Sequence, residues 1–298
     1  MSSGLGSKGA KYGLVEAGGT KVVCAVGCGE GELLERVRFE TTRPEEVFGK
    51  VRAFFEGVGV ALAGMGVATF GPVDVRDARS KDYGCILKTP KAGWEGASWV
   101  VALEGLSSGP VVVDTDVNGA ALGEAMWGTA KGLGTVVYVT VGTGIGGGVL
   151  MEGRPVHGWM HPEVGHMLVP RERGERDGFE GVCPFHGDCL EGMASGTAIA
   201  ARWGVQGQDL PDDHEAWDLE AGYLASMCAN LAFTVSPERI ILGGGVMQVP
   251  RVFELVRERF RGRVAGYLEL PELEGYIVPP AFGQDAGLVG ALALVRGG

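Results

Sequence analysis

Apolar residues in this chain gather in short, β-branched runs that end at glycine. In residues 12–27, YGLVEAGGTKVVCAVG, two apolar runs flank a pair of glycines, a pattern that predicts a β-hairpin with a tight turn. Residues 136–153, VVYVTVGTGIGGGVLMEG, repeat it. Residues 62–74 and 237–247 each indicate a buried strand that leads into a Gly-rich loop. Because hairpin and Gly-ended strand occur twice in the same order, the pattern predicts two similar α/β lobes.

Within residues 109–128, GPVVVDTDVNGAALGEAMWG, the spacing of the apolar residues changes from that of a strand to that of a helix. The run VVVD indicates a buried strand, and the residues after it have helical spacing. Asp114 and Asp116 lie at the junction. An Asp before a helix is most often an N-cap. A carboxylate at the carboxyl end of a buried strand in an α/β lobe also faces the ligand crevice. The segment alone leaves both interpretations open.

Composition and charge exclude several classes of protein. With 298 residues and 45% apolar content, the chain is long enough for two lobes. A net charge of −11 argues against nucleic-acid and anionic-membrane partners. We find no apolar run of membrane-spanning length and no apolar leader near the N-terminus. The six cysteines do not form a disulfide framework, so we expect a reducing, cytoplasmic location.

Glycine is unusually frequent in this chain. It accounts for 53 of the 298 residues, whereas its usual share is about 7%. Gly142, Gly144 and Gly147 match the dinucleotide fingerprint G-x-G-x-x-G, but that motif needs a following helix. The residues that follow are too rich in glycine and β-branched side chains to begin one. A Gly-rich hairpin can still expose consecutive N–H groups to an anion. Thr20, Lys21, Thr140 and Thr143 beside the two turns favour phosphate binding over plain hairpins.

Histidine and cysteine concentrate in residues 161–189, HPEVGHMLVPRERGERDGFEGVCPFHGDC. Cys183, His186 and Cys189 have the spacing of tight metal ligands, and His166 upstream would complete a His₂Cys₂ set. Four protein ligands make a closed tetrahedral zinc site, which is the structural type. A disulfide between the two cysteines and simple loop histidines are the alternatives. His161 is left without a role.

Taken in order, the motifs resemble those of the ROK sugar kinases. They are VEAGGTK, GPVD, DTDVNGAALGE, VTVGTGIGGG, HPEVGH, CPFHGDCLEG and LGGGV. TPKAGW at 89–94 and the C-x-x-H-x-x-C form are similar to the bacterial fructokinase subgroup. The resemblance runs from about residue 12 to the C-terminus. It implies an α/β, actin-like fold (the sugar kinase and actin-type ATPase fold), with two duplicated α/β lobes around a central cleft.

The resemblance also implies a division of the chain. We expect a flexible N-terminus at 1–11 and an N-terminal lobe at 12–116. The C-terminal lobe is expected at 117–284, with the zinc-binding loop 161–190 inserted in it. A C-terminal helix at about 285–298 is expected to pack back on the first lobe.

The resemblance implies a role for each matching residue, with Asp116 as the catalytic base. Thr115 stands before it where the family usually has Asn, and Glu16 stands where many relatives have Asp. ATP is expected to contact Gly18, Gly19, Thr20, Lys21, Thr140, Gly142, Thr143, Gly144, Gly243, Gly244 and Gly245. The sugar is expected to contact Gly71, Pro72, Asn118, Glu163, His166 and Glu191. Family precedent favours structural Zn²⁺ on His166, Cys183, His186 and Cys189.

The function implied is ATP-dependent phosphorylation of a hexose, most similar to a fructokinase, with Mg²⁺ carried by ATP. A homodimer is expected. The zinc is expected to hold the charged loop RERGERDGFEG beside Glu163. Two alternatives are a ROK kinase for glucose or mannose and a non-catalytic sugar-binding or regulatory ROK protein.

Overall fold

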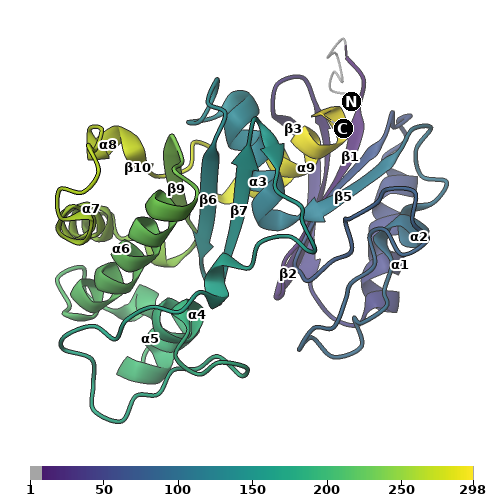
Figure 1. Ribbon diagram of the computed structural model, residues 1–298. Coiled ribbons are helices and arrows are strands. Elements are labelled where there is room, and N and C mark those ends of the chain that lie inside the picture. Colours follow the sequence, from purple (N-terminus) through teal and green to yellow (C-terminus); the bar gives the residue numbers. More distant parts are fainter. Residues whose placement is uncertain (1–8, 298) are drawn as a thin grey trace. The chain divides into compact units, whose positions relative to one another are not determined.

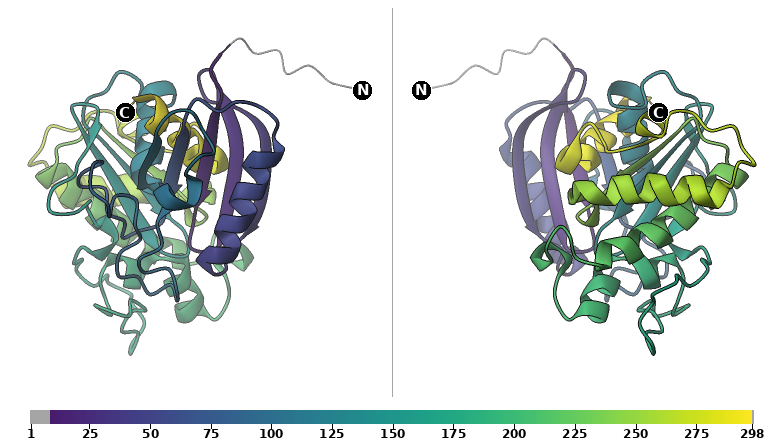
Figure 2. Two further views of the ribbon diagram at one scale, coloured as in Figure 1. Left: turned by 90° about the vertical axis from the view of Figure 1, so that its right-hand side faces the viewer. Right: turned by 90° about the vertical axis from the view of Figure 1, so that its left-hand side faces the viewer.

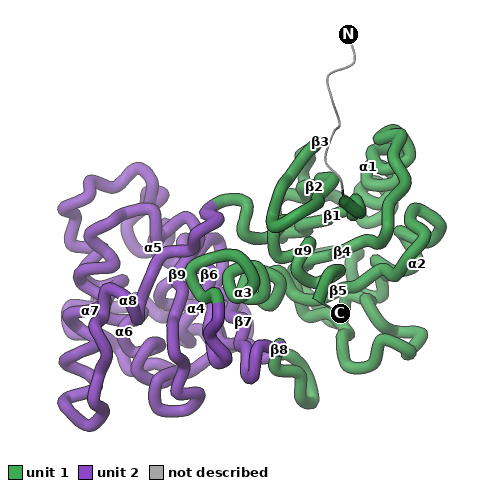
Figure 3. Tube along the Cα trace, turned by 90° about the horizontal axis from the view of Figure 1, so that it is seen from above, with its two compact units in different colours: residues 1–131, 155–161, 284–298 green, residues 132–154, 162–283 purple. Residues whose placement is uncertain are grey.

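A computed structural model describes residues 9–297, so most of the expected flexible N-terminus and residue 298 lie outside the described residues. The chain forms two compact units (Figure 3). The first comprises residues 1–131, 155–161 and 284–298, and the second comprises 132–154 and 162–283. The short segment 155–161 thus returns the chain to the first unit before it enters the second unit again.

The first unit contains a five-stranded sheet in the order β3-β2-β1-β4-β5 (Figure 1). Its strands are β1 (Tyr12–Ala17), β2 (Lys21–Cys28), β3 (Glu32–Glu40), β4 (Met65–Thr69) and β5 (Val111–Thr115). β1 pairs antiparallel with β2 and parallel with β4, and β5 runs parallel to β4. The hairpin predicted in residues 12–27 is therefore confirmed, and β4 is the buried strand predicted in 62–74.

Both faces of this sheet are covered, because its side chains alternate between two cores. Val15 and Val67 pack with helices α1 (Pro44–Gly57) and α2 (Trp99–Leu103). Leu14 and Ala68, their neighbours in the strands, pack instead with helix α9 (Ala286–Gly297). Figure 2 shows α1 lying along the strands of this sheet. Strands buried on both faces appear as continuous apolar runs, which is why the sequence showed runs rather than alternation.

The second unit repeats the first. Its sheet has the order β10-β9-β6-β7-β8, which is the order of the first sheet read from the opposite edge. The strands are β6 (Val136–Val141), β7 (Ile145–Met151), β8 (Arg154–Pro155), β9 (Arg239–Gly243) and β10 (Ile277–Val278). β6 pairs antiparallel with β7 and parallel with β9. The predicted internal repeat is confirmed, and the strand β7 after the G-x-G-x-x-G turn excludes a dinucleotide fold there.

Five helices accompany this second sheet. The two long ones, α6 (Ala216–Thr234) and α7 (Pro250–Val264), pack against each other (Figure 2). The short ones are α4 (Leu190–Ala194), α5 (Gly196–Trp203) and α8 (Leu273–Tyr276). Most side chains of α6 are buried, so it is the central helix of the unit. Within residues 9–297, no helix has the length and apolar character needed to cross a membrane.

Helix α3 (Asp116–Trp127) belongs to the first unit, although we expected the second lobe to begin at residue 117. It packs on α9 and β4. A methyl group on Gly290 of α9 would lie 2.3 Å from the carbonyl carbon of Gly119 in α3. One on Gly66 of β4 would lie 1.8 Å from the carbonyl oxygen of Ala291. These backbones approach so closely only because glycine has no Cβ.

Candidate active site and metal centre

The first Gly-rich turn joins β1 to β2 and presents exposed backbone. The Gly18 N–H donates to the Lys21 carbonyl at 2.9 Å, which leaves Gly19 and Thr20 as the exposed tip. The Thr41 hydroxyl donates to the Gly18 carbonyl at 2.7 Å, and the Lys91 ammonium donates to the Gly19 carbonyl. Lys91 belongs to the TPKAGW motif. The turn is therefore fixed by two side chains that the sequence did not connect with it.

The junction between β5 and α3 carries the two aspartates. Thr115 is the N-cap of α3, and its hydroxyl accepts a hydrogen bond from the Asn118 N–H at 3.1 Å. Asp116 is the first residue of the helix, and its Oδ1 lies 3.0 Å from the Val117 nitrogen. The sequence left open whether one of the aspartates caps this helix. In the structure the N-cap is Thr115.

The surroundings of the two carboxylates differ. The Asp114 carboxylate is buried, at 3% exposure, and accepts three hydrogen bonds. The donors are the Thr115 N–H at 2.7 Å, Asn118 Nδ2 at 2.8 Å and His157 Nε2 at 2.9 Å. Asp116 is only partly buried. The three donors hold the buried Asp114 carboxylate within the junction, whereas Asp116 is the more exposed of the two, so the geometry favours Asp116 as the residue that a substrate can reach.

The second Gly-rich turn lies between β6 and β7 and is attached to α5. The Gly142 carbonyl accepts from the Gly196 N–H at 2.7 Å, and the Thr197 hydroxyl donates to the Thr143 carbonyl at 2.7 Å. Glu191 of α4 accepts the Ile145 N–H at 2.9 Å. Glu191, expected only as a sugar contact, therefore also holds the end of this turn.

The third Gly-rich loop, residues 243–245, follows β9 in the same sheet. Gly244 has φ +94°, and a Cβ there would meet the Val141 carbonyl oxygen at 2.3 Å. Both features require glycine. Because Val141 ends β6, the close approach places this loop beside the second turn. The two predicted nucleotide-binding segments of this unit are thus brought together.

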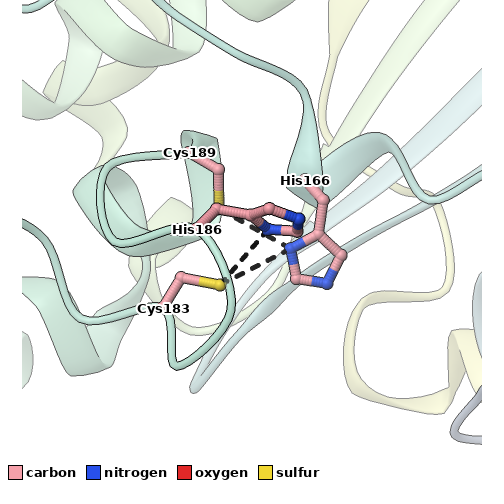
Figure 4. Close-up of side chains that lie close together, drawn as sticks. All are labelled: His166, Cys183, His186 and Cys189. Carbon is pink, nitrogen blue, oxygen red and sulfur yellow. Dashed lines mark hydrogen bonds between the residues drawn. The ribbon is translucent and has the colours of Figure 1, made fainter.

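The four predicted metal ligands converge in the second unit (Figure 4). Their ligand atoms all lie within 4.8 Å of one another. Nδ1 of His166 lies 3.8 Å from the Cys183 sulfur and 3.6 Å from the Cys189 sulfur, and Nδ1 of His186 lies 3.6 Å from the Cys183 sulfur. Sulfur and nitrogen ligands of tetrahedral zinc stand about 3.5 Å apart. Both cysteines are free thiols here, so the disulfide alternative is not adopted.

Local backbone structure fixes this ligand set. Cys183 and Gly187 exchange two backbone hydrogen bonds, at 3.2 and 2.9 Å, and so form a tight turn around His186. Gly187 has φ +67°. Cys189 is the N-cap residue of α4. Such a frame holds the donors in place, as a metal site requires, and the set of two thiols and two imidazoles suits Zn²⁺.

The charged loop between these ligands is held by more than the metal site. Arg202 of α5 is buried and pairs with Glu175 at 2.9 Å, and the Tyr223 hydroxyl donates to Glu175 at 2.7 Å. The guanidinium of Arg202 also lies 4.1 Å from the Phe179 ring centroid. The charged loop, which zinc was expected to hold, is therefore also anchored by a buried ion pair.

Two carboxylates flank the metal cluster along the chain. Glu163 precedes His166, whose N–H donates to the Glu163 carbonyl at 3.0 Å. Glu191 follows Cys189 by two residues. Burial raises the pKa of Glu163 to about 7, and the negative charge of Glu191 adds to the shift. Two carboxyl groups held near each other in this way are suited to accept hydrogen bonds from a polyhydroxyl ligand.

Solved structures with this arrangement place the fold in a known class. A ROK family glucokinase from Streptomyces griseus, in complex with glucose and AMPPNP, matches with a TM-score of 0.78 and 27% identity, over 97% of this chain and 100% of that one. The ROK hexokinase from Thermus thermophilus matches with a TM-score of 0.77, also at 27% identity and with the same coverage. The expected fold class, the actin-like fold of sugar kinases, is confirmed.

Sequence relatives narrow the class to a family. The ROK family profile matches residues 12–297. The fructokinase of Zymomonas mobilis is 45% identical, with 95% of each chain covered. That of Streptococcus mutans is 39% identical, with 96% of this chain and 97% of the other covered. The chain belongs to the ROK family.

The capping role of Thr115 can be tested by removing its hydroxyl. Thr115→Val should lower the free energy of unfolding by about 1 kcal/mol, because the Asn118 N–H loses its acceptor. Thr115→Ser should keep most of that stability. Urea unfolding of both variants checks this. Wild-type stability in the valine variant would return the capping role to an aspartate.

Proposed function

We propose that the chain is an ATP-dependent fructokinase, which transfers the γ-phosphoryl group of ATP to the 6-hydroxyl of D-fructose. The observation that carries this proposal is the 45% identity with the Zymomonas mobilis fructokinase over nearly the whole of both chains. Relatives named glucokinase stand at 28%. The proposal includes a homodimeric assembly and a cytoplasmic location, and the six free thiols suit a reducing compartment.

In the proposed mechanism Asp116 is the general base. Its carboxylate would accept the proton of the attacking sugar hydroxyl as the bond to phosphorus forms and the bond to the ADP oxygen breaks. Two features support this role. Thr115 caps α3, so Asp116 is not needed as a cap. Asp116 is also more exposed than Asp114. Gly71, Pro72, Asn118, Glu163, His166 and Glu191 are the proposed sugar-site residues.

The two Gly-rich turns and the loop 243–245 are proposed to bind ATP. Backbone N–H groups at exposed glycine turns favour the negative charge of phosphates. Gly18, Gly19, Thr20 and Lys21 would act in the first unit. Thr140, Gly142, Thr143, Gly144, Gly243, Gly244 and Gly245 would act in the second. Mg²⁺ bound with ATP supplies further charge neutralisation.

Zinc on His166, Cys183, His186 and Cys189 is proposed to be structural. All four positions would be filled by protein, which leaves no coordination site for substrate. His166 and Cys189 lie three and two residues from Glu163 and Glu191, respectively. Fixing both ligands would therefore fix the backbone that presents both carboxylates. This geometry connects the metal with sugar binding, while the buried pair Glu175–Arg202 holds the charged loop.

A hexose screen tests the substrate. Among D-fructose, D-glucose and D-mannose, D-fructose should give the highest kcat/KM in a coupled assay of ADP release. A higher kcat/KM with glucose or mannose would assign a different hexose and leave the kinase activity standing. Release of ADP that no hexose increases would contradict the kinase proposal itself.

Replacement of the base tests the mechanism. Asp116→Asn should lower kcat by roughly 10²-fold or more, because the amide cannot accept the proton, while the binding of D-fructose changes little. Asp209→Asn is the matched control, since Asp209 is exposed in the second unit. Its kcat should equal that of the wild type. A folded Asp116→Asn enzyme with normal turnover would remove Asp116 from the base role.

Metal analysis and metal loss test the zinc site. The purified protein should contain about one zinc per chain and should lose it more readily in acid, because the ligands must be deprotonated. Cys183→Ser should raise the KM for D-fructose by about 10-fold or more and leave the KM for ATP nearly unchanged.

Cys85→Ser is the control for the zinc experiment, because Cys85 is a free thiol of the first unit. It should keep the metal and both KM values. A zinc-free wild-type preparation with full activity contradicts the metal proposal. A Cys183→Ser enzyme with a raised KM for ATP and an unchanged KM for fructose contradicts the connection to the sugar.

A further inference from the structure

The segment 155–161, by which the chain returns to the first unit, carries two histidines with no assigned role. His157 and His161 are four residues apart, and both contact the body of the first unit. His161 is buried, at 5% exposure, and the side chain of His157 is 29% exposed. Both line a cavity of about 260 Å³ together with Pro72, Lys88 and Trp159.

His161 is attached to the loop that follows β4. Its Nε2 accepts the Val73 N–H at 3.3 Å. Because a backbone N–H can only donate, this Nε2 is unprotonated. The imidazole also lies against Gly71, where a Cβ would come within 3.2 Å of Cε1. His161 therefore touches residues on both sides of Pro72 and defines where the Gly71–Pro72 pair lies.

His157 is attached to the junction between β5 and α3. Its Nε2 lies 2.9 Å from Asp114 Oδ2. Here Nε2 must carry a proton, because the carboxylate accepts. The same interaction raises the pKa of His157. The other oxygen of Asp114 accepts from the Thr115 N–H and from Asn118 Nδ2. The buried carboxylate therefore transmits the position of His157 to the residues on either side of Asp116.

We propose that His157 and His161 are positioning residues for the transfer reaction, which fasten segment 155–161 at two points. His161 sets the Gly71–Pro72 loop, and His157 sets Asp116 through Asp114. The proposal rests on the proposed function, in which this loop contacts the sugar and Asp116 is the base. It predicts that the two histidines affect different kinetic constants, since they act on different groups.

Paired variants test the two attachments. His161→Leu should raise the KM for D-fructose about 3- to 10-fold, the effect of one lost hydrogen bond, with the KM for ATP unchanged. His161→Gln should restore most of the loss, because its amide oxygen can accept the Val73 N–H. His157→Leu should lower kcat about 10-fold, because a buried carboxylate loses a donor, and His157→Gln should recover most of it.

Folding is monitored by thermal melting and circular dichroism, with His214→Gln in the second unit as a control that leaves all constants unchanged. If His161→Leu does not fold, His161→Asn replaces it, since its shorter side chain cannot reach the Val73 N–H. The same rise in the KM for fructose is expected.

Four results would overturn the proposal. The first is wild-type constants in both folded leucine variants, and the second is glutamine variants as impaired as the leucine ones. The third is that kcat and both KM values worsen together, in proportion to the loss of thermal stability. The fourth is an unchanged affinity of His161→Leu for D-fructose by calorimetry without ATP. This last measurement does not depend on turnover, so it separates failure of this proposal from failure of Asp116 as the base.

Discussion

Close backbone contact through glycine is the constraint on which the first unit depends. Gly290 lies against Gly119, and Gly66 lies against Ala291, at separations that leave no room for a Cβ. These contacts bring α9 and α3 onto β4. Because Asp116 begins α3, the place of the proposed base follows from how deeply this helix can approach the sheet. A methyl group added at Gly119 or Gly290 would therefore displace α3, and Asp116 with it.

Within that frame, the buried polar groups of the site are satisfied by hydrogen bonds. Asp114 is buried and would be costly without donors, and it obtains three within its own unit. Asp116, two residues later, is more exposed, which suits the role of base proposed for it. In the second unit, a buried ion pair between Glu175 and Arg202 holds the charged loop, and the Cys–His cluster lies along the chain between the two carboxylates proposed to bind the sugar.

Much of the fold was predictable because its signals are local. The two hairpins, the buried strands and α3 follow from apolar runs broken by glycine, and the repeated order of these elements predicted two similar sheets. The four metal-ligand candidates were also predictable, since three of them lie within seven residues. The boundary of the lobes was not: α3 groups with the first unit through its contact with α9, which lies about 170 residues further along the chain.

By itself, the sequence determined the strand and helix pattern, the Gly-rich turns and the set of ligand types, because each depends on residues close together in the chain. Only the tertiary structure decided that Asp114 is the buried aspartate and Asp116 the more exposed one. One of the hydrogen-bond donors to Asp114 is His157, which no local pattern connects with it. The tertiary structure also brings His161 into contact with Val73, 88 residues away in the chain. A side chain's protonation and hydrogen-bonding role are set by the groups that folding brings to it, and those groups come from distant parts of the chain.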